Sequence, residues 1–193
     1  MSDMEPARPL TGVHHGAFRC RDAEQTRWFY EDVLGLKTAA ALVLDEVTGT
    51  GEKTPYMHIF FELGNGEFLA FFDCPASATE AKFQRKESFD LHWAFEVASE
   101  ADLLAMQQRI RQHGVKCAGP IDHHFVRSVY MYDPNGIQVE ITCRTADHDR
   151  ILVDAASHAT ADLAAWSART RAEKTAKFGE ALTRRAAAPR DGG

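Results

Sequence analysis

Three residues of metal-ligating type stand out in this chain: His15, His92 and Glu140. A histidine on an apolar strand is by itself more often structural, with a backbone hydrogen-bond partner. A glutamate inside an apolar run such as IQVEIT is harder to explain, because burying an unpaired carboxylate is costly. Two imidazoles and one carboxylate together suit an octahedral iron(II) or manganese(II) ion whose remaining positions stay open.

These residues occupy matching places in an internal repeat. The segment GVHHGAFRCRDAEQTRWFYEDVLGLK predicts a strand, a capped amphipathic helix and a glycine stop, and DLHWAFEVASEADLLAMQQRIRQHGV repeats that order. His15 and His92 lie 77 positions apart, and so do the predicted helix caps Asp22 and Ser99. The two histidines therefore stand at equivalent strand positions.

Each repeat ends with an Asn-Gly pair before an apolar strand, which is a strong hairpin signal. These pairs are Asn65-Gly66 and Asn135-Gly136. Ala70 follows the first glycine at the same distance as Glu140 follows the second. Glu140 and Ala70 are therefore equivalent, and three of the four symmetry-related positions carry metal-ligand types.

We predict an α+β fold in which two βαβββ modules, residues 11–75 and 88–144, pair into one curved mixed sheet. This cup has its helices outside. The predicted domain is residues 11–144, preceded by a flexible N-terminus over residues 1–10. Residues 145–193 form a helical extension with a frayed tail; its helix begins near Thr160 or Asp162 and ends near Arg184 and Arg185.

Strand alternation predicts which side chains line the cup. Phe68 and Phe72 share a face with Ala70, and Gln138 shares one with Glu140, so we expect these three to contact substrate. Simple core packing is the alternative for the phenylalanines. His14 points to the opposite face from His15, so we expect it to pack on the helix side or to hydrogen-bond a neighbour.

Composition excludes several classes of protein. A net charge of −6 and a pI near 5.8 argue against nucleic acid as a partner. No apolar run is long enough to span a membrane, and the first residues do not resemble a signal peptide. Four cysteines without metal-type spacing predict reduced, buried thiols and a cytoplasmic protein.

The stretches HHGAFRCRD, FYEDVLGL, LHWAFEV and DPNGIQVEI resemble the vicinal oxygen chelate superfamily, over about residues 11–144. That superfamily includes glyoxalase I, fosfomycin-resistance enzymes, methylmalonyl-CoA epimerase and extradiol ring-cleaving dioxygenases. The resemblance implies metal ligands at His15, His92 and Glu140. Glyoxalase-like members generally place a fourth ligand where this chain has Ala70, which favours the three-ligand members.

A longer match is to the extradiol dioxygenase signature, in the segment IDHHFVRSVYMYDPNGIQVE. The resemblance implies an iron(II) enzyme that cleaves a catechol-like aromatic diol with dioxygen. It also implies that Tyr130 hydrogen-bonds a substrate hydroxyl and that His123 supports Tyr130 or acts as acid/base. We expect a single-pair member that forms a homo-oligomer.

Two further functions remain open from the sequence. One is a non-oxidative metal-dependent isomerase, epimerase or thiol transferase, and the other is a non-catalytic protein that binds an aromatic ligand. The chain also departs from the extradiol pattern, because residues 59–91 hold no histidine to serve as the usual acid/base. His58 and His124 are possible substitutes, although we expect both at a surface or sheet edge. The substrate itself is not determined.

Overall fold

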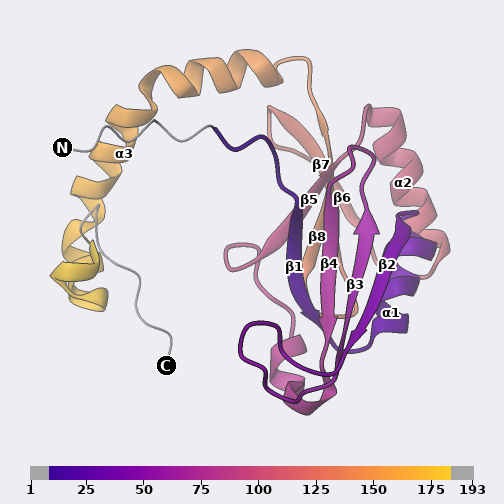
Figure 1. Ribbon diagram of the computed structural model, residues 1–193. Helices are drawn as coiled ribbons and strands as arrows, with labels where there is room; N and C mark the ends of the chain where they lie inside the picture. The colour runs from indigo at the N-terminus through magenta and orange to yellow at the C-terminus, as the bar shows by residue number, and fades with distance from the viewer. Residues whose placement is uncertain (1–8, 184–193) are drawn as a thin grey trace. The chain divides into compact units, whose positions relative to one another are not determined.

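The computed structural model describes residues 9–183. In the first compact unit, which ends at Thr145, the order strand, helix and three strands occurs twice, as predicted. The first module consists of β1 (His15–Cys20), α1 (Ala23–Arg27) with a π-helical continuation (Trp28–Val33), β2 (Lys37–Leu44), β3 (Tyr56–Glu62) and β4 (Phe68–Asp73). The second consists of β5 (His92–Glu96), α2 (Glu100–Gln112), β6 (Ala118–Asp122), β7 (Val126–Tyr132) and β8 (Gln138–Arg144), as Figure 1 shows. Two 3-10 turns, Pro75–Ser77 and Glu80–Phe83, lie between the modules.

Each module forms its own four-stranded mixed sheet, with the strand orders β1-β4-β3-β2 and β5-β8-β7-β6. β1 is parallel to β4 and β5 is parallel to β8, whereas the other neighbouring strands are antiparallel. The predicted pair of βαβββ modules is therefore confirmed. Within residues 9–183, however, no ladder of hydrogen bonds joins the two sheets into one.

The two modules meet at β1 and β5 through side chains rather than backbone. A Cβ atom on Gly16 would lie 2.6 Å from the Trp93 ring, and the ring centroids of Phe18 and Trp93 are 5.5 Å apart. Hydrogen-bonded strands lie about 4.8 Å apart, which leaves no room for an indole between them. The Trp93 ring thus packs against β1 where the two modules meet, and glycine at position 16 makes room for it.

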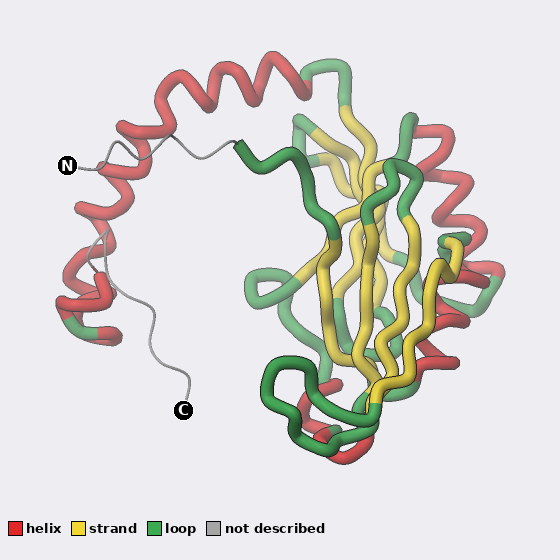
Figure 2. The backbone as a smooth tube through the Cα atoms, viewed as in Figure 1, coloured by secondary structure: helices red, strands yellow, loops and turns green. Residues whose placement is uncertain are grey.

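Both predicted helix starts are confirmed. The Asp22 carboxylate accepts a hydrogen bond from the Gln25 backbone at 2.7 Å, and the Ser99 hydroxyl accepts one from the Asp102 backbone at 3.2 Å. The helices lie next to each other, since the Arg109 side chain of α2 donates to the Val33 carbonyl at 2.8 Å (Figure 2). This contact ties the helical layer of one module to that of the other.

The modules share one hydrophobic core. Its largest fully buried side chains come from both modules: Phe29, Tyr30, Phe61, Leu69, Phe71, Leu103 and Ile110. A polar contact crosses the same interface, because the Tyr30 hydroxyl donates to the Asp133 carboxylate at 3.0 Å, with both residues buried. Burial raises the pKa of Asp133 above its ordinary 3.8. The four cysteines are free and buried, as predicted.

The second compact unit, Ala146–Gly193, contains helix α3 (His148–Phe178) and a 3-10 turn at Glu180–Thr183. The helix begins well before Thr160, where the sequence predicts its start. Alanines and i,i+4 pairs, such as His158 with Asp154 and with Asp162, favour helix through this upstream part. Within the described residues, no helix is long and apolar enough to cross a membrane. The expectations for residues 1–8 and 184–193 fall outside the described part.

Candidate functional site

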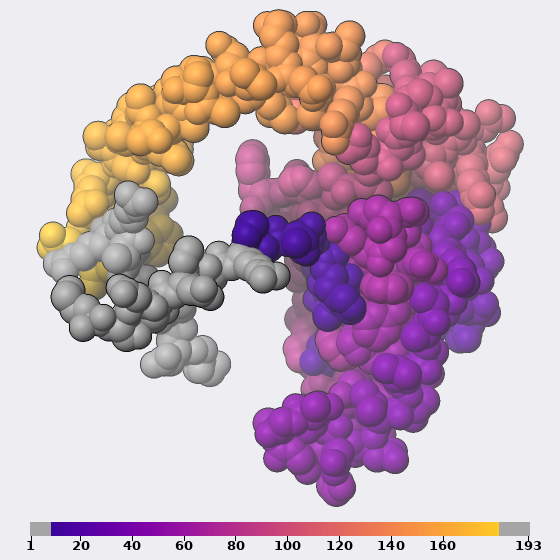
Figure 3. Space-filling model, turned by 45° about the horizontal axis from the view of Figure 1, so that its top comes forward, coloured from indigo at the N-terminus to yellow at the C-terminus, as the bar shows by residue number. Residues whose placement is uncertain are grey.

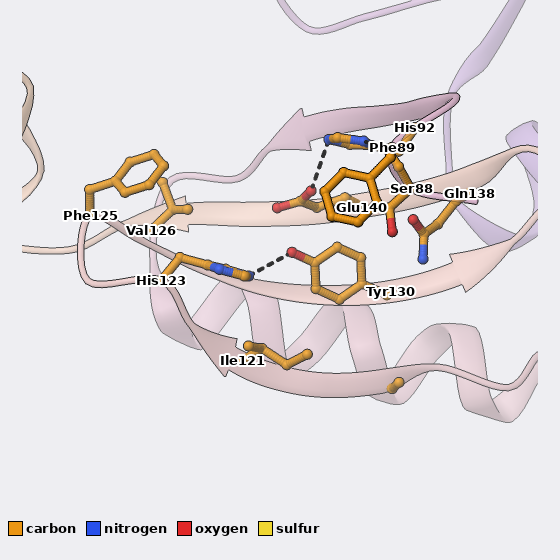
Figure 4. A pocket seen from close by; sticks show the side chains of 11 residues that line it. Ser88, Phe89, His92, Ile121, His123, Phe125, Val126, Tyr130, Gln138 and Glu140 are labelled. Carbon is orange, nitrogen blue, oxygen red and sulfur yellow. Dashed lines mark hydrogen bonds and ion pairs between the residues drawn. The ribbon is translucent and has the colours of Figure 1, made fainter. Parts of the chain in front are cut away.

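An open pocket of about 600 Å³ lies on the face of the second sheet that is turned away from α2 (Figure 4). Its lining residues all belong to the segment 88–140: Ser88, Phe89, His92, Ala118, Ile121, His123, Phe125, Val126, Tyr130, Gln138 and Glu140. Five of the sequence-predicted site residues are thus in one pocket. They come from β5, β7, β8 and the loop after β6.

His92 and Glu140 face each other in this pocket. Ala94 is the partner of Glu140 in the ladder between β5 and β8, and strand alternation puts His92 on the same face. His92 Nε2 and a Glu140 carboxylate oxygen are 3.7 Å apart. His92 Nδ1 lies 2.8 Å from the Ser88 carbonyl, which accepts hydrogen bonds only, so Nδ1 carries a proton. In the neutral imidazole, Nε2 then presents a lone pair to the carboxylate.

This arrangement fits a bound cation. Two electron-pair donors, His92 Nε2 and the carboxylate of Glu140, point toward the same space, and Glu140 is buried. None of the pocket residues is a lysine or arginine that could neutralise the carboxylate. Buried carboxylates are normally paired or bound to a metal. The backbone contact that orients His92 is also the kind of support that metal-ligating histidines have in proteins.

Tyr130 and His123 form a second polar pair beside Glu140. Tyr130 on β7 is the direct cross-strand partner of Glu140, and its hydroxyl lies 2.8 Å from His123 Nε2. Burial is the main cause that raises the pKa of Tyr130, so the phenol stays protonated at neutral pH. The pair is therefore able to hold and pass a proton next to the carboxylate.

Gln138 and the apolar residues complete the pocket. The Gln138 side-chain oxygen is buried and accepts no hydrogen bond from the described residues. Phe89, Ile121 and Phe125 also line the pocket, and each is at least one-third exposed. The pocket thus offers one unsatisfied polar atom in an apolar wall, which suits a ring with few polar substituents.

His15, Phe68 and Phe72 lie in the first module. His15 Nδ1 is 2.8 Å from His14 Nδ1, and the ring of His15 contacts those of His58 and Phe60. Within residues 9–183, no group of three histidine, cysteine or acidic side chains lies close enough to hold a metal ion. The structure therefore brings His92 and Glu140 together and does not bring His15 to them within one chain.

His58 is a residue whose position the sequence does not reveal. Its ring stacks on that of Phe72, with centroids 3.9 Å apart, and its Nε2 is buried with no hydrogen-bond partner in the described residues. Burial lowers the pKa of His58, and the nearby His15 lowers it further. His58 is half-buried on β3, an inner strand of the first sheet, so it is not at a sheet edge, whereas His124 is exposed as expected. The sequence signal for the position of His58 was its alternation with Phe60 along β3, which places both rings on the same face of the sheet.

A model of the Glyoxalase/Bleomycin resistance protein/Dioxygenase superfamily matches residues 12–141. A search of curated proteins finds no significant match to the sequence. Among solved structures, a glyoxalase/dioxygenase from Nostoc punctiforme is 28% identical, with a TM-score of 0.55 over 75% of this chain and 99% of that chain.

Two more distant structures share the fold. A glyoxylase/bleomycin resistance protein/dioxygenase domain from Frankia sp. EAN1pec is 18% identical, with a TM-score of 0.57 over 71% of this chain and 100% of that chain. A mutant of the fosfomycin resistance protein FosX from Listeria monocytogenes, in complex with Mn(II) and dihydroxypropylphosphonic acid, is also 18% identical, with a TM-score of 0.53 over 73% of this chain and 98% of that chain. At this identity the likeness concerns the fold alone.

Proposed function

Because the chain belongs to the Glyoxalase/Bleomycin resistance protein/Dioxygenase superfamily, we propose that it is an iron(II)-dependent extradiol-type dioxygenase acting on a catechol-like aromatic diol. The observation that carries the proposal is the pair of donors at 3.7 Å, His92 Nε2 and the buried Glu140 carboxylate, next to the Tyr130–His123 pair. Manganese(II) is the alternative ion for the same donors.

His92 and Glu140 are the pocket residues that would hold the ion, while His15, the third ligand predicted from the sequence, lies outside this pocket in the single chain. When bound, iron(II) would supply redox chemistry and the open positions at which a chelating diol and dioxygen react. The Ser88 carbonyl keeps His92 in the tautomer that leaves Nε2 free to bind. The apolar residues of the pocket would contact the ring of the substrate.

Proton handling falls to Tyr130 and His123. Because the Tyr130 phenol stays protonated, its hydroxyl can donate to a diol oxygen bound beside Glu140. His123 Nε2 is 2.8 Å from the same hydroxyl and can return the proton to it.

The pocket also favours a class of diol. It contains no lysine or arginine, so a carboxylate on the aromatic ring would be desolvated there without a counter-charge. We therefore propose a catechol whose other substituents are apolar. Each ring carboxylate is expected to reduce kcat/KM by about 10-fold or more, since an uncompensated charge costs well over 1.4 kcal/mol.

Anaerobic reconstitution with iron(II), followed by oxygen uptake with a panel of apolar and carboxylated catechols, tests the proposal. We expect oxygen uptake and a coloured ring-fission product from the apolar diols. Glu140→Gln should abolish both, while His158→Ala, a histidine of α3 outside the site, should not. Absence of oxygen uptake with every diol would refute the proposal, and proton exchange without redox turnover would identify a non-oxidative member instead.

A further inference from the structure

A second pocket of about 600 Å³ adjoins the pocket of Glu140. The two pockets have three lining residues in common: Ala118, Tyr130 and Gln138. Ala118 on β6 is the ladder partner of Tyr130, and Gln138 on β8 is the ladder partner of Tyr132. Ladder partners and alternate residues of a strand share a face, so these side chains lie on one side of the sheet. The second pocket therefore continues the first along β7, from Tyr130 toward Tyr132.

The second pocket differs from the first in its charge. Arg85 and Lys116 line it, and none of its lining residues is acidic. Both cations are exposed, and neither forms an ion pair with a residue that the structure describes. The chain as a whole has a net charge of −6, so two unpaired cations in one pocket are a local exception. A pocket lined by charges of one sign raises the local concentration of the opposite ion, here an anion.

Arg85 is held in place by contacts with the second sheet. Its Cζ atom lies 4.8 Å from the centroid of the Tyr132 ring. The backbone of Lys86, the next residue, donates to the Gly136 carbonyl at 2.8 Å, and the Lys86 carbonyl accepts from the Tyr132 hydroxyl at 3.1 Å. The segment that leads into β5 and carries Arg85 projects from the surface in Figure 3. The ring contact uses the face of the guanidinium, so its N–H donors remain available to an anion.

We propose that Arg85, Lys116 and Tyr132 form an anion subsite, which binds a carboxylate at the end of a substrate side chain. This inference rests on the proposed function, because the ring of that substrate would lie in the pocket of Glu140. Tyr132 is two residues beyond Tyr130 on β7, so the subsite begins about 7 Å further along the strand. A carboxylate directly on the ring would stay among apolar residues. One at the end of an apolar side chain would reach the two cations.

The surroundings of the subsite favour a monoanion. Gly114 lines the second pocket just beyond the C-terminal end of α2, which ends at Gln112. The last carbonyl groups of a helix carry partial negative charge, so they oppose a dianion more strongly than a singly charged group. A carboxylate is therefore a better match for this subsite than a phosphate.

Binding of two probes without a diol tests the subsite independently of turnover. 5-Phenylpentanoate separates a ring and a carboxylate by a distance similar to that between the two pockets, and 5-phenylpentanamide is its uncharged counterpart. Isothermal titration calorimetry at low ionic strength measures the Kd of each probe for the full-length chain. No metal is added, so the carboxylate cannot coordinate an ion at Glu140. Two exposed ion pairs of ordinary strength give an expected preference of about 5-fold for the carboxylate.

Substitution of the cations should remove this preference. Arg85→Gln/Lys116→Gln should bind the two probes about equally, and each single variant should lose part of the preference. The matched control is Lys37→Gln/Lys53→Gln, which removes the same charge from two exposed lysines of the first module. This control should keep the preference of the wild type. Circular dichroism of each variant establishes that it is folded.

Three results overturn the proposal: no binding of 5-phenylpentanoate by the wild type, equal affinity for the two probes, or a preference that Arg85→Gln/Lys116→Gln retains. Each of these leaves the proposed function intact, since neither probe is a diol. Conversely, a carboxylate preference in a chain that takes up no oxygen with any diol would remove the proposed function and keep the anion subsite. If both hold, the double variant should lower kcat/KM about 5-fold for a catechol that carries the same carboxylate chain.

Discussion

For Glu140→Gln, the structure predicts opposite effects on the free energy of unfolding in the metal-free and the metal-bound protein. In the metal-free protein, the Glu140 carboxylate lies 3.7 Å from His92 Nε2, which presents a lone pair when the ring is neutral. A glutamine amide at this position removes the charge and can donate a hydrogen bond to Nε2. We therefore expect the metal-free variant to be at least as stable as the wild type, although most substitutions of buried residues destabilise.

The magnitude follows from electrostatics. Two unit charges about 4 Å apart interact by about 4 kcal/mol at an effective dielectric constant of roughly 20. With a neutral His92 ring, the Nε2 lone pair carries only a fraction of a unit charge, so relief of its repulsion with the carboxylate contributes about 1 kcal/mol. With metal present, the substitution is expected to destabilise the protein. A free ion concentration of about 100 times the Kd stabilises the wild type by about 2.7 kcal/mol, and the variant loses most of this stabilisation.

Urea denaturation of both proteins, with chelator and with excess Mn(II), measures the two effects at one chain concentration. Glu96→Gln is the matched control, since Glu96 on β5 is exposed and pairs with Arg144. Its metal-dependent stabilisation should equal that of the wild type. The reasoning fails if metal-free Glu140→Gln is less stable than wild type by more than about 1 kcal/mol, or if Mn(II) stabilises it fully.

Three further predictions follow from the same structure. Gly16→Ala should lower the free energy of unfolding by about 1–3 kcal/mol because its Cβ would meet the Trp93 ring, whereas Gly64→Ala, with open space, should have little effect in the same urea assay. Tyr130→Phe should lower kcat about 100-fold with KM nearly unchanged in steady-state kinetics, and an equal rise in KM would indicate a binding role instead. Burial raises the pKa of Asp133, so the folded chain binds this proton more tightly than the unfolded chain and loses stability as pH rises from about 4. Asp133→Asn should flatten this dependence in denaturation curves measured across pH, and an unchanged profile would contradict it.

The local sequence was sufficient to predict the order of the helices and strands in the two modules. The helix caps Asp22 and Ser99 accept hydrogen bonds from residues only three positions further on, and each Asn-Gly turn involves two adjacent residues. Such features can therefore be predicted from one sequence. The equal spacing of the two repeats predicted the paired modules. Interactions of this kind depend on close neighbours, not on the rest of the fold.

Tertiary structure decided how the two modules meet. Two contacts join residues that are far apart in sequence: the Trp93 ring against Gly16, and the buried Tyr30–Asp133 hydrogen bond. No local sequence pattern predicts either contact. In the arrangement that these contacts hold together, His15 does not reach His92 within one chain. A contact between neighbouring strands also determines the surroundings of His58, because Phe72, which stacks on its ring, comes from a different strand. The types of the candidate ligands and their positions in the strands could therefore be predicted from local sequence. Which of these ligands come together in one site depends on packing between distant segments.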